Sequence, residues 1–508
     1  MNPIEGLMYG FGVAMTPENF LAALFGALLG TAVGILPGMG PTVVMAILLV
    51  PTMNMKVETG LIMLGAIYYG TQYGDSMTAI LMNVPSEAPS VVIGIDGYQI
   101  AKKGRAGAAL AIAAVGSFIG ATVGLVGLTL IAGPVSQAAL AFGPPEYFAI
   151  TVVGLFVLSK ISSASLSKGL VALGIGLALT TVGIEPLSGM PRYTFGNVDL
   201  MLGVDLVPMV MGIIGMAEMI DIASKNAGLP KAVSINYRDL MPTRAEWKKA
   251  IPASFRGSFL GFFMGLLPGP TMALSTFASY RLEKRLAPGE VGHGAVQAVA
   301  GPKSADDGSI SGTLVPLMAL GIPFTAVTAV LFAGLLLHGV TPGPTLITER
   351  PEIFWGLVAA MYIGNVALLV LNFPLVGIWT SILRIPQPIL SAMLVVLMMI
   401  GTYSLRNSTL DMMVLVMAGI LGYIMKQLNY ERTLLILGLV LGPMLEANFG
   451  RSLEMSDGDL SIFVTRPIPN TLWVILALVL FVPPLLKAIT GRRARIARTD
   501  EPESRPLI

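Results

Sequence analysis

Two sets of small polar residues lie beside breaks in apolar stretches, and they are the residues of this sequence best suited to bind a small ligand. The first set belongs to GILPGMGPT at 34–42 and YGTQYGDSMTAILMNVPSEAPS at 69–90, and the second to GLLPGPT at 265–271 and DGSISGTLVPLMALGIPFT at 307–325. Proline removes a backbone donor, and glycine lets the chain turn and a ligand approach closely. These segments therefore predict binding through backbone groups, hydroxyls and amides.

The expected chemistry is the binding of an anion with little help from Lys or Arg. A helix N-terminus carries partial positive charge and holds a carboxylate, whereas free carbonyls at a broken C-terminal end hold a cation. The candidate substrate-binding residues are Gly38, Gly40, Thr42, Thr71, Gln72, Asn83, Pro85, Ser86, Gly269, Thr271, Ser304, Ser309, Ser311, Gly321, Pro323 and Thr325.

Three aspartates are candidates for binding a coupling ion or proton. Asp75 lies inside an apolar segment, where an ionisable residue is costly and a functional candidate by default. A structural hydrogen-bonding role is the alternative for Asp75. Asp306 and Asp307 follow Lys303, so a local ion pair is the alternative for them. The expected ion is Na⁺ or H⁺, and the sequence indicates no other metal and no cofactor.

The two sets correspond to each other, which indicates a repeat. Aligning Pro85 with Pro323 also aligns Gly70 with Gly308 and Gly74 with Gly312. In membrane proteins, paired apolar segments interrupted by Gly and Pro in two halves point to the substrate site of a transporter. Close helix packing is the alternative for the two Gly-x-x-x-Gly pairs. An ordinary kink or span boundary is the alternative for the two Leu-Pro-Gly motifs.

Composition places these segments in a membrane. The chain is 54% apolar and 12% charged, against roughly 25% charged in soluble domains. Apolar runs of about 20 residues, long enough to span a bilayer, recur along the chain and predict roughly eleven to thirteen membrane segments. We expect an all-α polytopic membrane protein of two structurally repeated halves, related as inverted repeats, with broken helices or re-entrant hairpins.

The expected division follows the polar stretches. Residues 1–223 form the first transmembrane half, 224–250 a cytoplasmic connector, 251–488 the second half, and 489–508 a basic cytoplasmic tail. Lys and Arg cluster at 102–105, in the connector and in the tail, which the positive-inside rule places in the cytoplasm. The N-terminus lacks a basic region before its first apolar segment and is expected outside.

Several classes of chemistry lack the residues they need. The chain has no cysteine, and its two histidines, His293 and His338, are too far apart in sequence for a metal-ligand motif. No GxxxxGK[ST] motif occurs, so a Walker-type ATP site is excluded. Nothing in the sequence suggests nucleic-acid binding. Energy for transport would then come from an ion gradient.

The sequence resembles the large membrane subunit of the tripartite tricarboxylate transporters. The resemblance covers nearly the whole chain and is carried by GILPGMGPT, GAIYYGTQYGDSMTAILMNVP, DGYQIAKKGRAG (96–107), LEKRL (282–286), LMALGIPFTAVTAVLFAGLLLHGVTPGP (317–344) and LILGLVLGPMLEANF (435–449). It implies a secondary transporter of the bacterial inner membrane that imports carboxylates by Na⁺ or H⁺ symport. The implied partners are a small membrane subunit of four spans and a periplasmic substrate-binding protein.

The chain departs from the family pattern near the candidate site. Asp75 replaces a common small residue, Ser86-Glu87 stands where Gly-Thr is frequent, and PKSADD at 302–307 stands where PESANN is familiar. These changes of charge favour a substrate with fewer carboxylates than a tricarboxylate, or one with an amino or other cationic group.

Two other classes of function remain open on the sequence. One is a self-contained carboxylate carrier or channel that needs no binding protein. The other is an intramembrane aspartyl enzyme, because Asp75 with Asp306 and Asp307 could supply paired carboxylates for water activation. The aspartates lie in corresponding broken segments and nothing else resembles a peptidase, so transport is favoured.

Overall fold

The computed structural model describes residues 2–36, 40–85, 87–162, 165–185, 189–224, 241–382, 387–480 and 482. Most of the predicted connector and the whole basic tail lie outside these residues. The described part is almost entirely helical, and its strands are β1 (Gly183–Ile184) and β2 (Pro191–Arg192), which pair antiparallel. The prediction of an all-α protein is therefore confirmed.

The first half contains ten α-helices in the described residues. They are α1 (Pro3–Ala14), α2 (Pro17–Gly34), α3 (Pro41–Thr52), α4 (Val57–Met82), α5 (Ala88–Ile100), α6 (Ala106–Ala139), α7 (Pro144–Ser162), α8 (Leu166–Thr180), α9 (Leu206–Val210) and α10 (Ala217–Ser224). Short π-helical segments η1 (Ala101–Arg105) and η3 (Met211–Met216) join neighbouring helices, and η2 (Asp199–Leu202) is a 3-10 turn.

The second half begins with α11 (Arg244–Gly265). Further along are α12 (Thr271–Leu286), α13 (Gln297–Leu320), α14 (Ala326–Leu337), α15 (Leu346–Glu349), α16 (Pro351–Ile382), α17 (Gln387–Arg406), α18 (Thr409–Gln427), α19 (Arg432–Met455) and α20 (Ile462–Thr465). Several helices, such as α1, α7 and α16, begin with proline. Proline suits the first helical position because the amide that it lacks would have no partner within the helix there.

Seven apolar helical stretches in the described residues are long enough to cross a membrane, and shorter ones accompany them. The long ones are Pro17–Gly34, Ala88–Ala139, Pro144–Ser162, Leu206–Ser224, Pro351–Leu371, Thr409–Gln427 and Arg432–Met455. The central helices α4 and α13 are not among them, yet almost all of their residues are buried. Their polar residues are thus shielded from lipid by the surrounding apolar helices.

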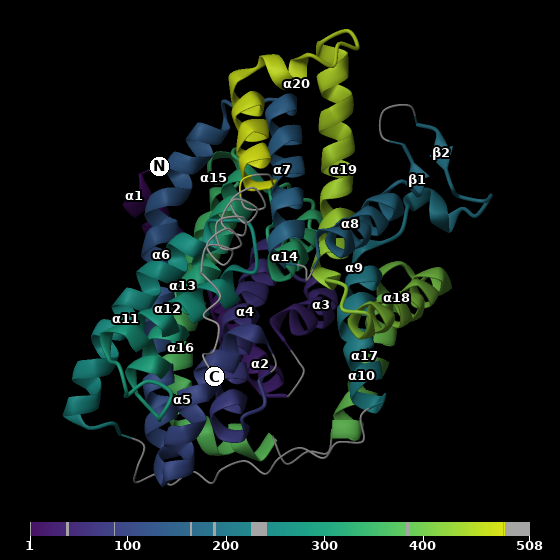
Figure 1. Cartoon of the computed structure of the whole chain (residues 1–508). Helices are drawn as coiled ribbons and strands as arrows, with labels where there is room; N and C mark the ends of the chain where they lie inside the picture. Colours follow the sequence, from purple (N-terminus) through teal and green to yellow (C-terminus); the bar gives the residue numbers. More distant parts are fainter. Residues whose placement is uncertain are drawn as a thin grey trace, which may run out of the picture.

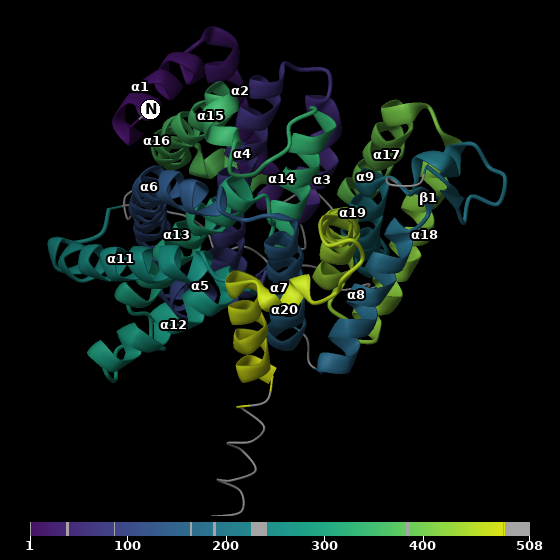
Figure 2. The ribbon, with the colours of Figure 1, turned by 90° about the horizontal axis from the view of Figure 1, so that it is seen from above.

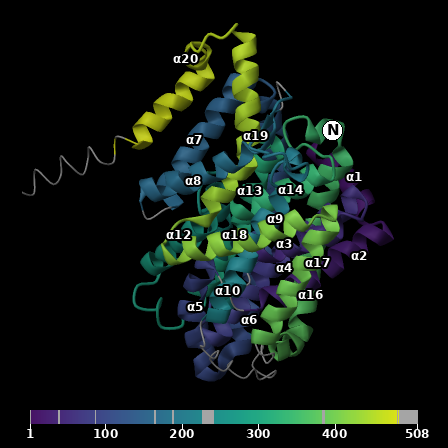
Figure 3. The same ribbon diagram turned by 90° about the vertical axis from the view of Figure 1, so that its right-hand side faces the viewer.

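The helices form two groups with a third set between them. Figure 2 shows α6, α11, α12 and α13 in one group and α8, α9, α17 and α18 in the other, with α3, α7 and α14 in the middle. Within the first group α13 packs against both α11 and α6. In the views of Figures 1 and 3, α19 runs beside α7 and extends toward the second group.

Glycines allow two equivalent helix pairs, α2 with α4 and α11 with α13, to pack backbone to backbone. A side chain at Gly34 would collide with the Thr71 carbonyl oxygen, and one at Gly265 with that of Ser309. Each of these glycines stands three residues before the proline of a Leu-Pro-Gly motif. The contacts of the two pairs thus correspond residue for residue next to the two breaks.

The glycine pairs of α4 and α13 lie in the same contacts. A Cβ at Gly70 or Gly74 would strike the carbonyl oxygens of α2, and one at Gly308 or Gly312 would strike those of α11. This is the geometry that small-xxx-small spacing produces between membrane helices. All four glycines therefore allow close helix packing, which is the alternative that the sequence left open for these two pairs.

The basic cluster at 102–105 lies at the junction of the halves. Gly104 has a φ of 82° and bends the chain between α5 and α6. Arg105 forms a bidentate ion pair with Glu246 in the first turn of α11. The Lys103 ammonium donates to the His293 carbonyl at 2.7 Å. These contacts tie the end of α5 to the second half outside the apolar part of the fold.

Buried Asp96 strengthens the same junction. Its carboxylate accepts hydrogen bonds from the Tyr280 hydroxyl at 2.9 Å and from the backbone amides of Gly292, Gly294 and Ala295 at 2.7–3.0 Å. One side chain of the first half therefore fixes the loop that leads into α13.

The glycine contacts predict a strong position dependence for Gly→Ala changes. Gly261→Ala places a Cβ against the Ala305 carbonyl, and overpacking of this kind costs about 1–3 kcal/mol. The matched control is Gly133→Ala in α6, where a Cβ meets nothing within 4 Å. We expect the melting temperature in detergent to fall for Gly261→Ala and to stay level or rise for Gly133→Ala. Equal effects of the two changes would contradict the packing account.

The Arg105–Glu246 pair predicts an acid-sensitive contribution to stability. Hydrogen bonds from Arg105, followed by those from Thr243, lower the pKa of Glu246 from 4.5 to about 2. A carboxyl whose pKa is lower in the folded state stabilises the fold above its unfolded pKa, and this contribution is lost as the pH falls toward the folded value. Glu246→Gln should therefore lower the melting temperature at neutral pH, and the difference from wild type should shrink below about pH 4.5.

The control for this measurement is Glu349→Gln. Glu349 is exposed, and the described residues supply no ion-pair partner for it. A deficit of Glu246→Gln that does not change between neutral and acid pH would show that the ion pair is not the cause.

Candidate substrate-binding site

The predicted breaks coincide with four helix starts and two left-handed helix ends. In the first half α3 starts after Gly40 and α5 after Glu87; in the second half α12 starts after Pro270 and α14 after Thr325. The helices that precede α5 and α14 end in left-handed residues, Asn83 with φ of 56° and Gly321 with φ of 71°. Both ends reverse the chain just before Pro85 and Pro323.

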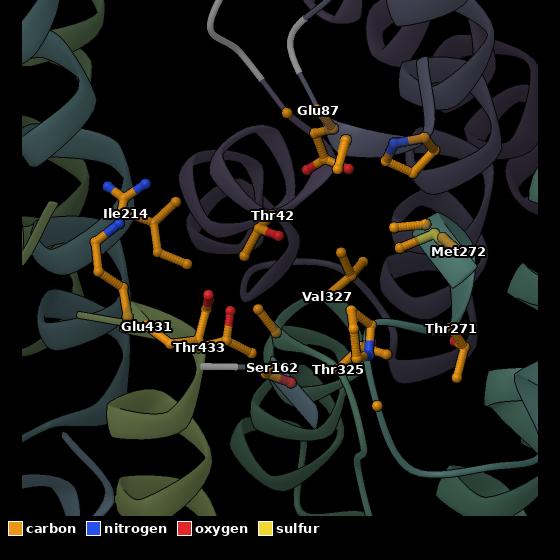
Figure 4. Close-up of a pocket in the computed structure, with 18 of the residues that line it drawn as sticks. Thr42, Glu87, Ser162, Ile214, Thr271, Met272, Thr325, Val327, Glu431 and Thr433 are labelled. Atoms are coloured by element: carbon orange, nitrogen blue, oxygen red, sulfur yellow. The ribbon is translucent and has the colours of Figure 1, made fainter. Parts of the chain in front are cut away.

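All four helix starts line one cavity of about 460 Å³. The lining is Gly40, Thr42, Val43, Glu87, Ala88, Pro89, Leu158, Ser162, Ile214, Glu218, Gly269, Pro270, Thr271, Met272, Ala273, Phe324, Thr325, Ala326, Val327, Lys426, Glu431, Arg432 and Thr433. Figure 4 shows Thr42, Glu87, Thr271 and Thr325 around this space, with Glu431 and Thr433 on the side opposite Thr271. Segments far apart in sequence thus meet at one site.

Most of these helix starts lack a side-chain cap. Gly40, Glu87 and Pro270 make no capping hydrogen bond, and neither does Glu431 at the start of α19. Only α14 has a capping box, formed by Thr325 and Thr328. Uncapped helix N-termini carry partial positive charge and amide donors. The cavity wall therefore favours an anionic group.

The hydroxyl of Thr271 is an unsatisfied polar group in this wall. Thr271 is 2% exposed, and its Oγ1 has no hydrogen-bond partner among the described residues. A buried hydroxyl without a partner costs free energy and calls for a ligand or water. A carboxylate in the cavity would supply the missing acceptor at the start of α12.

The basic side chains that line the cavity are paired with carboxylates, so they do not make it positively charged. Lys426 contacts Glu218 at 2.8 Å and Asp221 at 2.6 Å, and Arg432 lies 3.7 Å from Glu218. Glu218 thus holds both basic residues of the lining. The Glu87 carboxylate lies against Gly40 at the start of α3, and the described residues give it no hydrogen-bond or ion-pair partner. The partial positive charge at the cavity wall therefore comes from the backbone.

The three candidate aspartates gather around a buried lysine. The Lys303 ammonium lies 2.9 Å from Asp307 Oδ2 and 3.5 Å from Asp306 Oδ2, and all three side chains are almost fully buried. It also donates to the Gln72 carbonyl of α4 at 3.3 Å. Asp75, one turn further along α4, lies within electrostatic range of Lys303. The local ion pair is present, but in the interior and between the two halves.

Gln72 connects this charged cluster to the cavity. Its backbone carbonyl accepts from Lys303, while its side-chain amide contacts the sulfur of Met272 at 3.0 Å. Met272 belongs to the cavity lining. One layer of side chains therefore separates the predicted ion site from the predicted substrate site. No group of three or more His, Asp or Glu side chains in the described ranges is arranged to hold a metal ion.

Comparison with known proteins decides the family. The model of the tripartite tricarboxylate transporter TctA family matches residues 20–437. The chain belongs to this family. It is similar over 98% of its length, at 42% identity, to 99% of an uncharacterized 52.8 kDa protein from the TAR-I ttuC′ 3′ region of Agrobacterium vitis. No solved structure matches the chain.

A second relative matches about half of the chain. It is an uncharacterized protein from the TAR-II ttuC′ 3′ region of the same organism, with 42% identity over 47% of this chain and all of its own length. The TctA family is a family of transporters, which decides against the intramembrane enzyme. Family and apolar helices together show a multi-pass membrane protein of a carboxylate transport system.

Five of the predicted substrate residues of this TctA-family chain line the cavity. They are Gly40, Thr42, Gly269, Thr271 and Thr325. Gln72 stands behind Met272, and Asn83, Pro85, Gly321 and Pro323 form the chain reversals before α5 and α14. Gly38 and Ser86 lie outside the described residues.

Four further predicted residues use their hydroxyls in hydrogen bonds within a helix or between two helices. Thr71 donates to the Ile67 carbonyl, and Ser309 donates to that of Asp306, both at 2.7 Å. Ser304 donates to the Gly116 carbonyl of α6 at 2.8 Å, and Ser311 pairs with the Tyr69 hydroxyl at 2.6 Å. None of the four is part of the cavity lining, so their predicted role in substrate binding stays a prediction.

Sequence reasoning missed the side of the cavity formed by α10, α18 and α19. Lys426, Glu431, Arg432 and Thr433 stand between two apolar helices and resemble ordinary polar residues of a span boundary. A signal was present, because Glu431-Arg432-Thr433 immediately precedes a long apolar run, as expected for a helix start. Nothing in the sequence indicated that this helix start meets the two repeated segments.

Proposed function

We propose that this chain is the large permease subunit of a binding-protein-dependent tripartite system that imports a small organic carboxylate by secondary transport. The observation that carries the proposal is the meeting of uncapped helix starts from both repeated segments at one cavity, where the buried Thr271 hydroxyl lacks a partner. Family membership supports transport of a carboxylate.

The substrate is proposed to carry one or two carboxylates, or a carboxylate together with an amino or other cationic group. The helix starts offer dipoles and amides to one anionic group. Glu87 and Glu431 also line the cavity and offer acceptor oxygens to a cationic group rather than donors to further carboxylates. Because Glu218 already engages Lys426 and Arg432, these two residues add little free positive charge.

The mechanism is alternating access around this cavity, driven by an ion gradient. Helices α3 and α5 of the first half and α12 and α14 of the second contribute to the same wall, so movement between the halves would open the site to one side at a time. The Asp75, Asp306 and Asp307 cluster is the candidate coupling site, linked to the cavity through Gln72 and Met272.

The proposed partners are a small four-span membrane subunit and a periplasmic substrate-binding protein. The proposed location is the bacterial inner membrane, with the C-terminus in the cytoplasm. The name of the family supports a system of several subunits. The binding protein would deliver the carboxylate to the external side of the cavity.

Uptake of labelled mono-, di- and tricarboxylates and amino-carboxylates tests the proposal. Cells would express the chain with both partners, without the binding protein, or without this chain, in the presence and absence of a Na⁺ or H⁺ gradient. We expect gradient-dependent accumulation that requires all three proteins. Accumulation without the binding protein would instead indicate a self-contained carrier. No accumulation of any carboxylate by well-expressed protein would refute the proposal.

The unpartnered hydroxyl predicts a specific loss in Thr271→Val. A hydrogen bond to a charged group contributes about 1.5–3 kcal/mol, so the substrate concentration for half-maximal uptake should rise about tenfold or more. Thr271→Ser keeps the hydroxyl and should stay close to wild type. An unchanged uptake curve for Thr271→Val, at equal surface expression, would place the carboxylate away from the start of α12.

A further inference from the structure

Lys303 is an ammonium group enclosed by oxygen atoms between the two halves. Its side chain is 0% exposed, and its contacts are Asp307 Oδ2 at 2.9 Å, Asp306 Oδ2 at 3.5 Å and the Gln72 carbonyl at 3.3 Å. The aspartates belong to α13 and the carbonyl to α4. The Lys303 ammonium therefore connects α13 to α4.

These oxygen atoms are the ligands that a hard cation prefers. Carboxylates and backbone carbonyls bind alkali and alkaline-earth ions in proteins, and broken-helix transporters hold coupling ions with them. In this chain the cation among them is covalently attached, at the end of a lysine side chain. The ammonium occupies the space that a free ion would need.

Charge explains why a cation is favoured at this position. Asp306 and Asp307 bring two buried carboxylates to the ammonium of Lys303, and Asp75 of α4 lies within electrostatic range of it. Removing one partner from a buried ion pair leaves an uncompensated charge in a region of low dielectric, which is strongly destabilising. A cation at this position therefore stabilises the ionised carboxylates between α4 and α13.

We propose that Lys303 is a built-in substitute for a coupling Na⁺, so that this transporter works without Na⁺ binding at the junction of α4 and α13. The inference rests on the proposed function for its meaning in transport, but the ion-binding property can be tested on the purified chain alone. Gradient energy then comes from protons rather than from Na⁺.

Two substitutions separate the loss of charge from the opening of space. Lys303→Ala removes the ammonium and leaves a void beside Asp306, Asp307 and the Gln72 carbonyl. Lys303→Met also removes the charge but fills the void with an apolar side chain of similar length. Only the alanine variant should therefore accept Na⁺ in place of the lysine.

Thermal unfolding of the purified chain in detergent is the decisive measurement. Melting temperatures would be compared in NaCl, KCl and choline chloride at equal ionic strength, so that screening is the same. We expect wild type to melt alike in all three salts. Na⁺ should raise the melting temperature of Lys303→Ala by about 2 °C or more, saturably and relative to choline. Lys303→Met should show no such response.

An independent surface lysine serves as the control. Lys249 is half-exposed and pairs with Glu290, so Lys249→Ala should behave as wild type in all three salts. A saturable Na⁺-specific rise in wild type would overturn the inference, and so would a folded Lys303→Ala that ignores Na⁺. If Lys303→Ala is recovered folded only from Na⁺ buffers, the inference is supported. If neither lysine variant folds, the melting temperatures of wild type in the three salts still decide whether the protein binds Na⁺.

Transport measurements distinguish this inference from the proposed function. Carboxylate uptake by wild type that requires a Na⁺ gradient would confirm carboxylate import and overturn the role of Lys303. Uptake that follows a proton gradient and is indifferent to Na⁺ would support both. Absence of carboxylate uptake would refute the proposed function, while the melting temperatures would still decide whether Lys303 takes the place of Na⁺.

Discussion

The structure depends on the inability of a bilayer to hydrogen-bond the backbone. Each break in a membrane helix exposes amides and carbonyls that lipid cannot satisfy, so a break is stable only against protein or a polar cavity. Here the helix starts at Gly40, Glu87, Pro270 and Thr325 face the same cavity. The requirement that makes such breaks costly in lipid also concentrates their donors and their partial positive charge in one place.

Glycine packing gives these breaks fixed positions. Gly34 and Gly265 bring the ends of α2 and α11 against the carbonyls of Thr71 and Ser309. Because these contacts are between backbones, they leave no side-chain freedom to adjust the distance between helices. The ends of α2 and α11 are therefore anchored next to α4 and α13, the helices that carry the charged cluster.

The proposed substrate site and the proposed coupling site are separated by one layer of side chains. The proposed carboxylate site relies on helix starts, because Glu218 pairs with the nearby Lys426 and Arg432. Behind Met272, the interior holds Lys303 with its aspartates. Gln72 contacts both regions, so a shift of α4 relative to α12 and α13 would change the cavity wall and the surroundings of the ammonium together. This arrangement gives a physical route for the proposed coupling.

Composition and motif spacing were enough to predict the class of the protein, the places where helices break and part of the cavity. Composition requires burial of most of the chain in a membrane, and the paired Leu-Pro-Gly motifs identify Gly40, Thr42, Gly269 and Thr271 because Pro and Gly act locally on the backbone. The packing of the helices was needed to show that α19 completes the cavity and that Ser304 and Ser311 bond to neighbouring helices. It was also needed to show that Lys303 reaches the carbonyl of Gln72. These outcomes depend on which helices lie side by side, and a hydroxyl or ammonium can satisfy its hydrogen bonds equally well with a ligand or with a neighbouring helix.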